Sequence, residues 1–139
     1  MGKITVEVSL KSNISNVWKN WTDPVGITNW NHASDDWCCP RATSDLRVGG
    51  KFNYRMESVN DKSVGFDFEG EYTRVEPENT LAYFMTDGRK VEIKFEKIDN
   101  MRTKLIETFD AETQNSEELQ RNGWQAILEN FKKYCETVK

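Results

Sequence analysis

Residues 45–109 of the chain read DLRVGGKFNYRMESVNDKSVGFDFEGEYTRVEPENTLAYFMTDGRKVEIKFEKIDNMRTKLIETF, and this stretch decides the fold. Apolar and polar residues alternate through it, as they do in antiparallel strands with one buried face. Val48–Lys51 (VGGK) and Thr86–Arg89 (TDGR) are typical of two-residue hairpin turns, because Gly-Gly and Asp-Gly tolerate the positive φ that those turns need. The pattern predicts a meander of about six strands in series. Softer turn signals lie at residues 60–62, 77–79 and 99–100.

The chain before this meander predicts one more strand and two short helices. Residues 4–10 alternate between apolar and polar side chains, which favours a strand. Residues 14–21 place apolar side chains at helical spacing, and Asp23–Pro24 is a typical start for a second short helix that runs toward Trp30. Residues 31–43 show no clear period, so we expect an irregular loop there.

The chain after the meander predicts a long amphipathic helix over residues 115–138. It begins with Asn115 as an N-cap, followed three residues later by Glu118. One sheet face needs cover, and the helices supply it. We therefore predict an α+β fold, in which a curved antiparallel sheet of about seven strands wraps around this helix. The helix has an apolar stripe of Leu119, Trp124, Ile127, Leu128, Phe131, Tyr134, Cys135 and Val138.

Composition narrows the class of protein. With 139 residues, 37% of them hydrophobic and 30% charged, the chain fits a single domain over residues 1–139. A net charge of −4 without a basic run argues against nucleic-acid binding, and no apolar stretch is long enough for a membrane span. The N-terminus lacks the apolar core of a signal peptide, and three cysteines fit free thiols, so we expect a cytoplasmic protein.

Six segments of the chain carry a resemblance to a known family. They are Val17–Pro24 (VWKNWTDP), Trp30–Trp37 (WNHASDDW), Asp45–Phe52 (DLRVGGKF), Phe68–Tyr72 (FEGEY), Glu107–Glu112 (ETFDAE) and Gly123–Leu128 (GWQAIL). These segments and the order of elements resemble the helix-grip fold of the START-like (Bet v 1-like, SRPBCC) superfamily, and within it the bacterial single-domain members of the activator of Hsp90 ATPase homologue-like (AHSA1-like) family. The resemblance covers essentially the whole chain.

The resemblance implies a cavity between the sheet and the C-terminal helix, in which superfamily members hold hydrophobic small molecules. We therefore expect a protein that binds an apolar or aromatic small molecule there, without a cofactor or a metal. A cyclase- or hydrolase-like enzyme that uses the same cavity remains an alternative, although we favour a binding protein. The family name adds Hsp90 as a further alternative partner, and a homodimer is also open.

The chain is rich in aromatic side chains, with five Trp, seven Phe and four Tyr. These supply large apolar contacts, and Tyr and Trp add a polar group that can orient a ligand. We expect at least half of them to be core residues. The predicted ligand-binding residues are Trp30, Trp37, Phe52, Tyr54, Met56, Phe66, Phe68, Tyr72, Phe95, Glu107, Trp124 and Phe131.

Two residues are weak candidates for catalysis, Glu107 and His32. Alternation places Glu107 on the inward face of its strand, where a buried carboxyl must be paired, hydrogen-bonded or protonated. We favour a structural pair with Arg, Tyr or a backbone amide over a role as a general acid. His32 lies in a polar cluster with Asp35, Asp36, Cys38 and Cys39, whose spacing matches no standard zinc site. A nucleophilic pair of His32 with Cys38 or Cys39 is disfavoured, because no glycine-rich or helix-start donor for an oxyanion hole lies beside the cysteines.

Overall fold

The computed structural model describes residues 2–138 and confirms the predicted α+β helix-grip architecture. One seven-stranded antiparallel sheet has the strand order β1-β7-β6-β5-β4-β3-β2. The strands are β1 (Lys3–Leu10), β2 (Trp37–Ser44), β3 (Lys51–Ser58), β4 (Gly65–Glu76), β5 (Thr80–Met85), β6 (Lys90–Asp99) and β7 (Arg102–Asp110), and the helices are α1 (Ile14–Thr22), α2 (Pro24–Trp30) and α3 (Glu117–Thr137).

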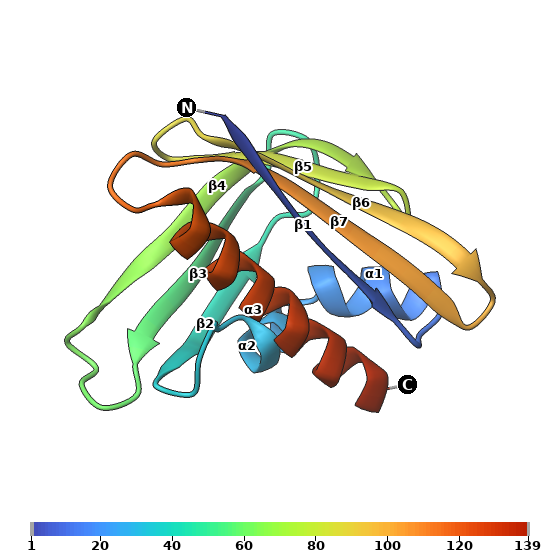
Figure 1. The fold of residues 1–139 in the computed structure, drawn as a ribbon, viewed down its shortest axis with the longest axis horizontal. Coiled ribbons are helices and arrows are strands. Elements are labelled where there is room, and N and C mark those ends of the chain that lie inside the picture. The colour runs from blue at the N-terminus through green and yellow to red at the C-terminus, as the bar shows by residue number, and fades with distance from the viewer. Residues whose placement is uncertain (1, 139) are drawn as a thin grey trace.

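The sheet curls into two limbs around the C-terminal helix. In Figure 1, β2–β4 form the left limb, β5–β7 and β1 form the right limb, and α3 runs diagonally between them. The Gln125 side chain on α3 donates a hydrogen bond of 2.9 Å to the Glu7 carbonyl on β1. At the C-terminal end of α3, the Asn16 amide on α1 donates to the Val138 carbonyl at 2.8 Å. Helix α3 is thus tied to β1 near its middle and to α1 at its C-terminal end.

The segment from Trp37 to Ser44 corrects one prediction, because it is strand β2 and not part of an irregular loop. It pairs with β3, and its register shifts between Cys38 and Arg41. Pro40 lies inside this irregularity, where its missing N–H costs no ladder hydrogen bond. Because β2 is an edge strand with a bulge, its side chains do not show the simple alternation that identifies the other strands.

Both predicted two-residue hairpin turns are longer than expected. In the β5–β6 connection, the Gly88 amide donates to the Met85 carbonyl at 2.8 Å, and Gly88 alone has a positive φ, of 89°. A two-residue primed turn over Asp87–Gly88 would need a positive φ at Asp87, which Asp87 does not have. The Met85 amide instead donates to the Arg89 carbonyl at 2.8 Å, so the loop has three residues, 86–88. The β2–β3 connection spans residues 45–50, and its Gly49 amide donates across the sheet to the Tyr72 carbonyl at 2.8 Å.

The helix starts are set by local side-chain caps. Asn13 caps α1 and Asp23 caps α2, with Pro24 in the first turn as predicted. Helix α3 is capped by Ser116 and not by Asn115, since the Ser116 hydroxyl accepts from the Leu119 amide at 3.1 Å. Leu119 is 58% exposed and Val138 is 37% exposed, so neither belongs to the buried stripe in which the sequence placed them.

The core fills the space between the inner sheet face and the helices. Gly70 on β4 makes room for it, because the Phe52 ring on the neighbouring strand lies directly over it. A Cβ at Gly70 would lie 2.7 Å from that ring and 2.6 Å from the Phe84 carbonyl oxygen. The largest fully buried side chains are Tyr72, Phe109, Phe131, Ile4, Leu10, Ile27, Ile93, Leu105, Leu128, Val17, Val91 and Thr103.

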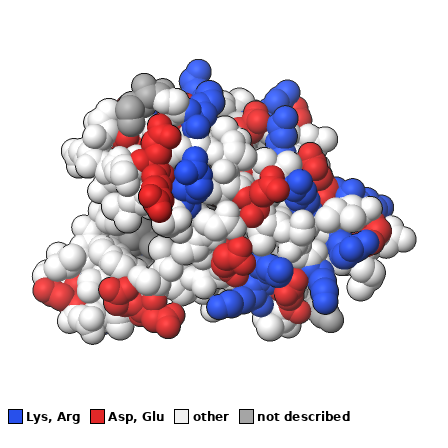
Figure 2. Space-filling view, in the orientation of Figure 1, with Lys and Arg blue, Asp and Glu red and all other residues white. Residues whose placement is uncertain are grey.

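Charged side chains of both signs are interspersed over the face shown in Figure 2. Acidic groups gather at the lower left, where the β3–β4 connection and the start of β2 lie in Figure 1. None of the helices within residues 2–138 is both long and apolar enough to cross a membrane.

Candidate functional site

A cavity of about 210 Å³ lies between the inner face of the sheet and helices α2 and α3. Its walls are predominantly aromatic and aliphatic, with a few polar groups among them. The lining residues are Trp21, Trp30, Asn31, Tyr54, Met56, Phe66, Phe68, Leu81, Tyr83, Glu107, Trp124 and Ile127.

Aromatic rings from opposite sides of the fold form the cavity walls. On the helical side, Trp21 and Trp30 stack with 4.6 Å between ring centroids. On the β3–β4 side, the rings of Tyr54 and Phe68 are parallel to within 10°. The two sets come from segments far apart in sequence, and each ring is held by further aromatic contacts in the core, so the cavity has a rigid, pre-formed wall.

Glu107 supplies the carboxyl group of the cavity. It lies on β7 between Val6 of β1 and Ile93 of β6, and only 4% of it is exposed. Burial raises the pKa of Glu107 from 4.5 to about 8, with no hydrogen bond or charge to oppose the effect. Among residues 2–138, every fully buried side-chain nitrogen or oxygen has a hydrogen-bond partner. Glu107 has no such partner, so its oxygens are not fully enclosed and open onto the cavity that this residue lines.

The structural pair that we expected for Glu107 is therefore not formed by any residue in the described range. Tyr83 on β5 is an ionisable residue that lines the same cavity and feels the charge of Glu107. Burial, and then the charge of Glu107, raise the pKa of Tyr83 well above its usual value. A buried carboxyl with its pKa raised is protonated at neutral pH, and this explains how Glu107 is tolerated without a partner.

Tyr54, Tyr83 and Asn31 add polar side-chain groups to the cavity lining, and Tyr54 is linked to polar groups behind the wall. The Tyr54 hydroxyl lies 3.5 Å from the Tyr72 hydroxyl, which in turn lies 2.8 Å from the Ser44 hydroxyl. The Asn31 amide donates to the Met56 sulfur at 3.5 Å. These groups can orient a polar substituent on a ligand, while the surrounding rings hold its apolar part.

Seven of the predicted ligand-binding residues line this cavity, namely Trp30, Tyr54, Met56, Phe66, Phe68, Glu107 and Trp124. Phe52, Tyr72, Phe95 and Phe131 lie in the buried core instead, and Trp37 packs against Phe66 with 6.0 Å between ring centroids. Sequence reasoning missed Trp21, Asn31, Leu81, Tyr83 and Ile127. The alternation of β5 already placed Leu81 and Tyr83 on one face, and that signal would have identified them.

The polar cluster around His32 is not brought into the cavity. The His32 backbone carbonyl accepts a hydrogen bond from the Asn130 side chain on α3, and Asp35 and Asp36 are exposed. No group of three or more His, Cys, Asp or Glu side chains within residues 2–138 could hold a metal ion. Cys39 is 2% exposed, and burial raises the pKa of its thiol to about 11, so this thiol does not resemble an activated nucleophile.

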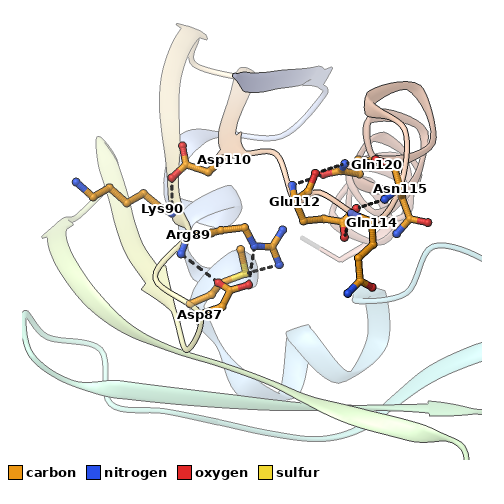
Figure 3. Close-up of polar contacts among 9 residues, drawn as sticks. Asp87, Arg89, Lys90, Asp110, Glu112, Gln114, Asn115 and Gln120 are labelled. Carbon is orange, nitrogen blue, oxygen red and sulfur yellow. Dashed lines mark hydrogen bonds and ion pairs between the residues drawn. The ribbon is translucent and has the colours of Figure 1, made fainter. Parts of the chain in front are cut away.

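Hydrogen bonds at the start of α3 position the cavity wall that this helix provides. The Gln120 side chain donates to the carbonyls of Glu112 and Asn115 at 3.1 and 2.9 Å, and it accepts from the Glu112 amide at 2.9 Å (Figure 3). Arg89 from the β5–β6 turn pairs with Asp87 at 2.8 Å and points toward the same loop. Trp124 lies one helical turn beyond Gln120. The hydrogen bonds of Gln120 to the preceding loop therefore help to set the position of Trp124 in the cavity wall.

A larger hollow, of about 520 Å³, lies on the outer face of the sheet. Two of its three basic side chains are engaged with neighbours, since Lys3 pairs with Asp110 at 2.8 Å and Arg74 pairs with Glu76 at 3.0 Å. Because the inner cavity combines rigid aromatic walls with an unpaired buried carboxyl, we place the candidate site there.

A curved antiparallel sheet that closes over a long C-terminal helix defines the helix-grip fold of START/Bet v 1-like ligand-binding domains. The chain belongs to the family described as activator of Hsp90 ATPase homolog 1-like protein, whose pattern matches residues 11–136. The confirmed family resemblance therefore covers nearly the whole chain.

Solved structures agree with this assignment. The AHSA1-like protein from Aeromonas hydrophila is 43% identical, with a TM-score of 0.91 over 99% of this chain and 94% of that chain. A protein from Cytophaga hutchinsonii is 44% identical, with a TM-score of 0.83 over 97% of this chain and 92% of that one. The Aha1 dimer from Colwellia psychrerythraea is 16% identical, with a TM-score of 0.75 over 100% and 99%, and shares the fold. A comparison with curated proteins gave no match.

Proposed function

We propose that this protein binds a small aromatic or apolar molecule in the cavity between the sheet and α3. The observation that carries the proposal is a pre-formed aromatic chamber with one unpaired carboxyl group, Glu107, on its wall. Concave apolar sites with a few convergent polar groups are the usual form of small-molecule sites. The three free cysteines fit a reducing compartment, which supports the cytoplasm as the place of binding.

The cavity volume limits the size of the ligand. An engineered apolar cavity of about 150 Å³ accommodates benzene. The cavity of about 210 Å³ described above therefore suits one aromatic ring with a short substituent. A long acyl chain would need the walls to move apart.

Ligand-observed NMR with a panel of monocyclic aromatic compounds tests this proposal. Ile127→Trp fills the cavity from α3 and is expected to abolish binding, because Ile127 lines the cavity. Leu119→Trp is the matched control, since it adds the same side chain at an exposed position on the same helix and is expected to leave binding unchanged. Equal binding by both variants, or no binding of any compound by the wild type, would contradict the proposal.

A second candidate function is acid–base catalysis in the same cavity, and the state of Glu107 favours it. A carboxyl whose pKa is raised to about 8 holds a proton at neutral pH and can act as a general acid. Native mass spectrometry of the protein purified from its host identifies any molecule that co-purifies. Turnover of that molecule by the wild type, lost in Glu107→Gln while binding persists, would support catalysis, whereas unchanged turnover would exclude this role for Glu107.

Two protein partners come from the relatives. The Colwellia psychrerythraea relative is an Aha1 dimer, so a second copy of this chain is one partner to test. Light scattering after size-exclusion chromatography distinguishes a monomer from a dimer directly. The other candidate partner is Hsp90, which the family name suggests. Retention of the purified chain on immobilised Hsp90 at micromolar concentration tests this partner.

A further inference from the structure

Glu107 gives the cavity a preference for one sign of ligand charge. We infer that the ligand is an arylalkylamine, in which a short alkyl chain carries the amine, with its ammonium group on the Glu107 carboxylate and its ring between the two aromatic walls. This inference rests on the proposed function, and it names the chemical class of ligand that the cavity takes.

The charges around the cavity support a cation and disfavour an anion. Within the described residues, the cavity lining contains Glu107 and no Lys, Arg or His. An anionic ligand such as an aromatic acid would meet no counter-charge and would lie beside a carboxyl group. An ammonium group would donate hydrogen bonds to the Glu107 carboxylate, which accepts none from the protein.

The aromatic walls add a second attraction for a cation. Indole and phenol faces carry negative charge density that attracts an ammonium group within about 6 Å, most strongly where water is excluded. Trp21 and Trp30 present such rings on one side of the cavity, and Tyr54 presents another on the opposite side. Rings and carboxylate together form the combination that recognises organic cations.

Binding of a cation must change the protonation of Glu107. In the free protein burial keeps this carboxyl largely protonated at neutral pH. When an ammonium group binds, the Glu107 proton passes to the buffer, and the carboxylate pairs with the ligand. The affinity therefore rises from pH 6 toward pH 8, and falls again at more alkaline pH, where the amine loses its own proton.

The surroundings of Glu107 contain few other groups that titrate in this range. Val6 on β1, Ile93 on β6 and Trp124 and Ile127 on α3 carry no titratable group. Trp30 and Asn31, at the end of α2, carry none either. The ionisable neighbours are Tyr83, Tyr54 and Tyr72, together with Arg89, whose charge opposes the rise in the pKa of Tyr83. Because the pKa values of Tyr83 and Tyr54 are raised, both tyrosines stay neutral through pH 8.

Isothermal titration calorimetry with three probes of similar size tests the inference. Benzylamine, toluene and phenylacetate differ in charge but share one ring. At pH 8 we expect the wild type to bind benzylamine at least about tenfold more tightly than toluene, because of the charge-assisted hydrogen bond, and to bind phenylacetate more weakly than toluene. At pH 7, titrations in buffers of different ionisation enthalpy should show release of close to one proton per benzylamine bound.

Two variants separate the role of Glu107 from general effects. Glu107→Gln should weaken benzylamine binding at least about tenfold, abolish proton release and leave toluene binding within about twofold. Glu7→Gln is the control, since the Glu7 carboxylate lies on the outer face of the neighbouring strand and pairs with Lys104 at 3.5 Å. It should leave all three affinities unchanged.

Each result points to one conclusion. If toluene binds and benzylamine binds no more tightly, or if phenylacetate binds most tightly, the inference is wrong while the proposed function stands. If no probe binds, both are wrong. The proton release is measured on the wild type, so it decides the matter even if Glu107→Gln fails to fold.

Discussion

The Trp124 indole lies flat on the Phe109 ring, with 3.9 Å between the ring centroids and 11° between the ring planes. This contact joins α3 to β7 in the middle of the fold. Trp124 also lines the cavity, so the same side chain anchors the helix and bounds the site. The stack ties the position of the cavity wall to the stability of the domain.

Trp124→Ala should lower the free energy of unfolding by about 3 kcal/mol, since it removes both the buried area of the indole and the aromatic stack. Urea denaturation measures the change. Leu119→Ala provides the comparison on the same helix, and its exposed side chain predicts a change within about 0.5 kcal/mol. Equal losses in the two variants would show that the stack does not hold α3 in place.

Sequence reasoning predicted the elements whose side chains follow a simple period. On β7, Leu105, Glu107 and Phe109 alternate with outward residues, and the structure buries all three. Strand β2 was missed, because a bulge and an edge position disrupt its period. On α3 the period was recognised, but the cap lies at Ser116, and the buried residue of the first turns is Gln120, whose polar side chain holds the preceding loop.

The pH dependence of stability should report on Glu107. Its pKa rises from 4.5 in the unfolded chain to about 8 in the folded state, so the folded state binds more protons between these values. The free energy of unfolding must therefore fall as the pH rises from 5 to 8, by roughly 3–5 kcal/mol. Asp87, Asp99, Asp110 and Glu112 have lowered pKa values and lose their contribution only at more acidic pH.

Urea denaturation at pH 5, 6, 7 and 8 measures this effect. Glu107→Gln replaces the carboxyl by a neutral group of the same shape and should remove the decline. Glu7→Gln, on the outer face, should keep it. Parallel curves for the wild type and Glu107→Gln would show that the carboxyl is not held in its protonated form.

Two glycines should respond in opposite directions to the same substitution. Gly70→Ala places a Cβ 2.6 Å from a backbone oxygen and 2.7 Å from the Phe52 ring, so we expect a loss of at least about 2 kcal/mol. Gly123→Ala, in the middle of α3, meets no atom within 4 Å and should stabilise the protein by about 0.5–1 kcal/mol. Thermal denaturation of both variants tests the pair, and a stable Gly70→Ala protein would mean that the Phe52 ring moves freely.

The candidate site was only partly predictable, because a cavity is what side chains leave unfilled. Inward alternation identified Tyr54, Phe68 and Glu107, but it assigned Phe52 to the same role. The Phe52 ring lies over Gly70 on the neighbouring strand and is buried in the core. This contact joins two strands, so the pattern of a single strand does not reveal it. The absence of a partner for Glu107 within residues 2–138 likewise depends on distances across the fold.

The three cysteines should differ sharply in their reaction with iodoacetamide in the folded protein. Cys39 and Cys135 are buried, and burial raises the pKa of both thiols, whereas Cys38 is partly exposed. We expect mass spectrometry at pH 8 to show one fast modification at Cys38, with the other two at least about a hundredfold slower, because they need local opening of the structure. Cys38→Ser should remove the fast phase and leave the slow one, and rapid modification of Cys39 in this variant would show that β2 opens readily from the edge of the sheet.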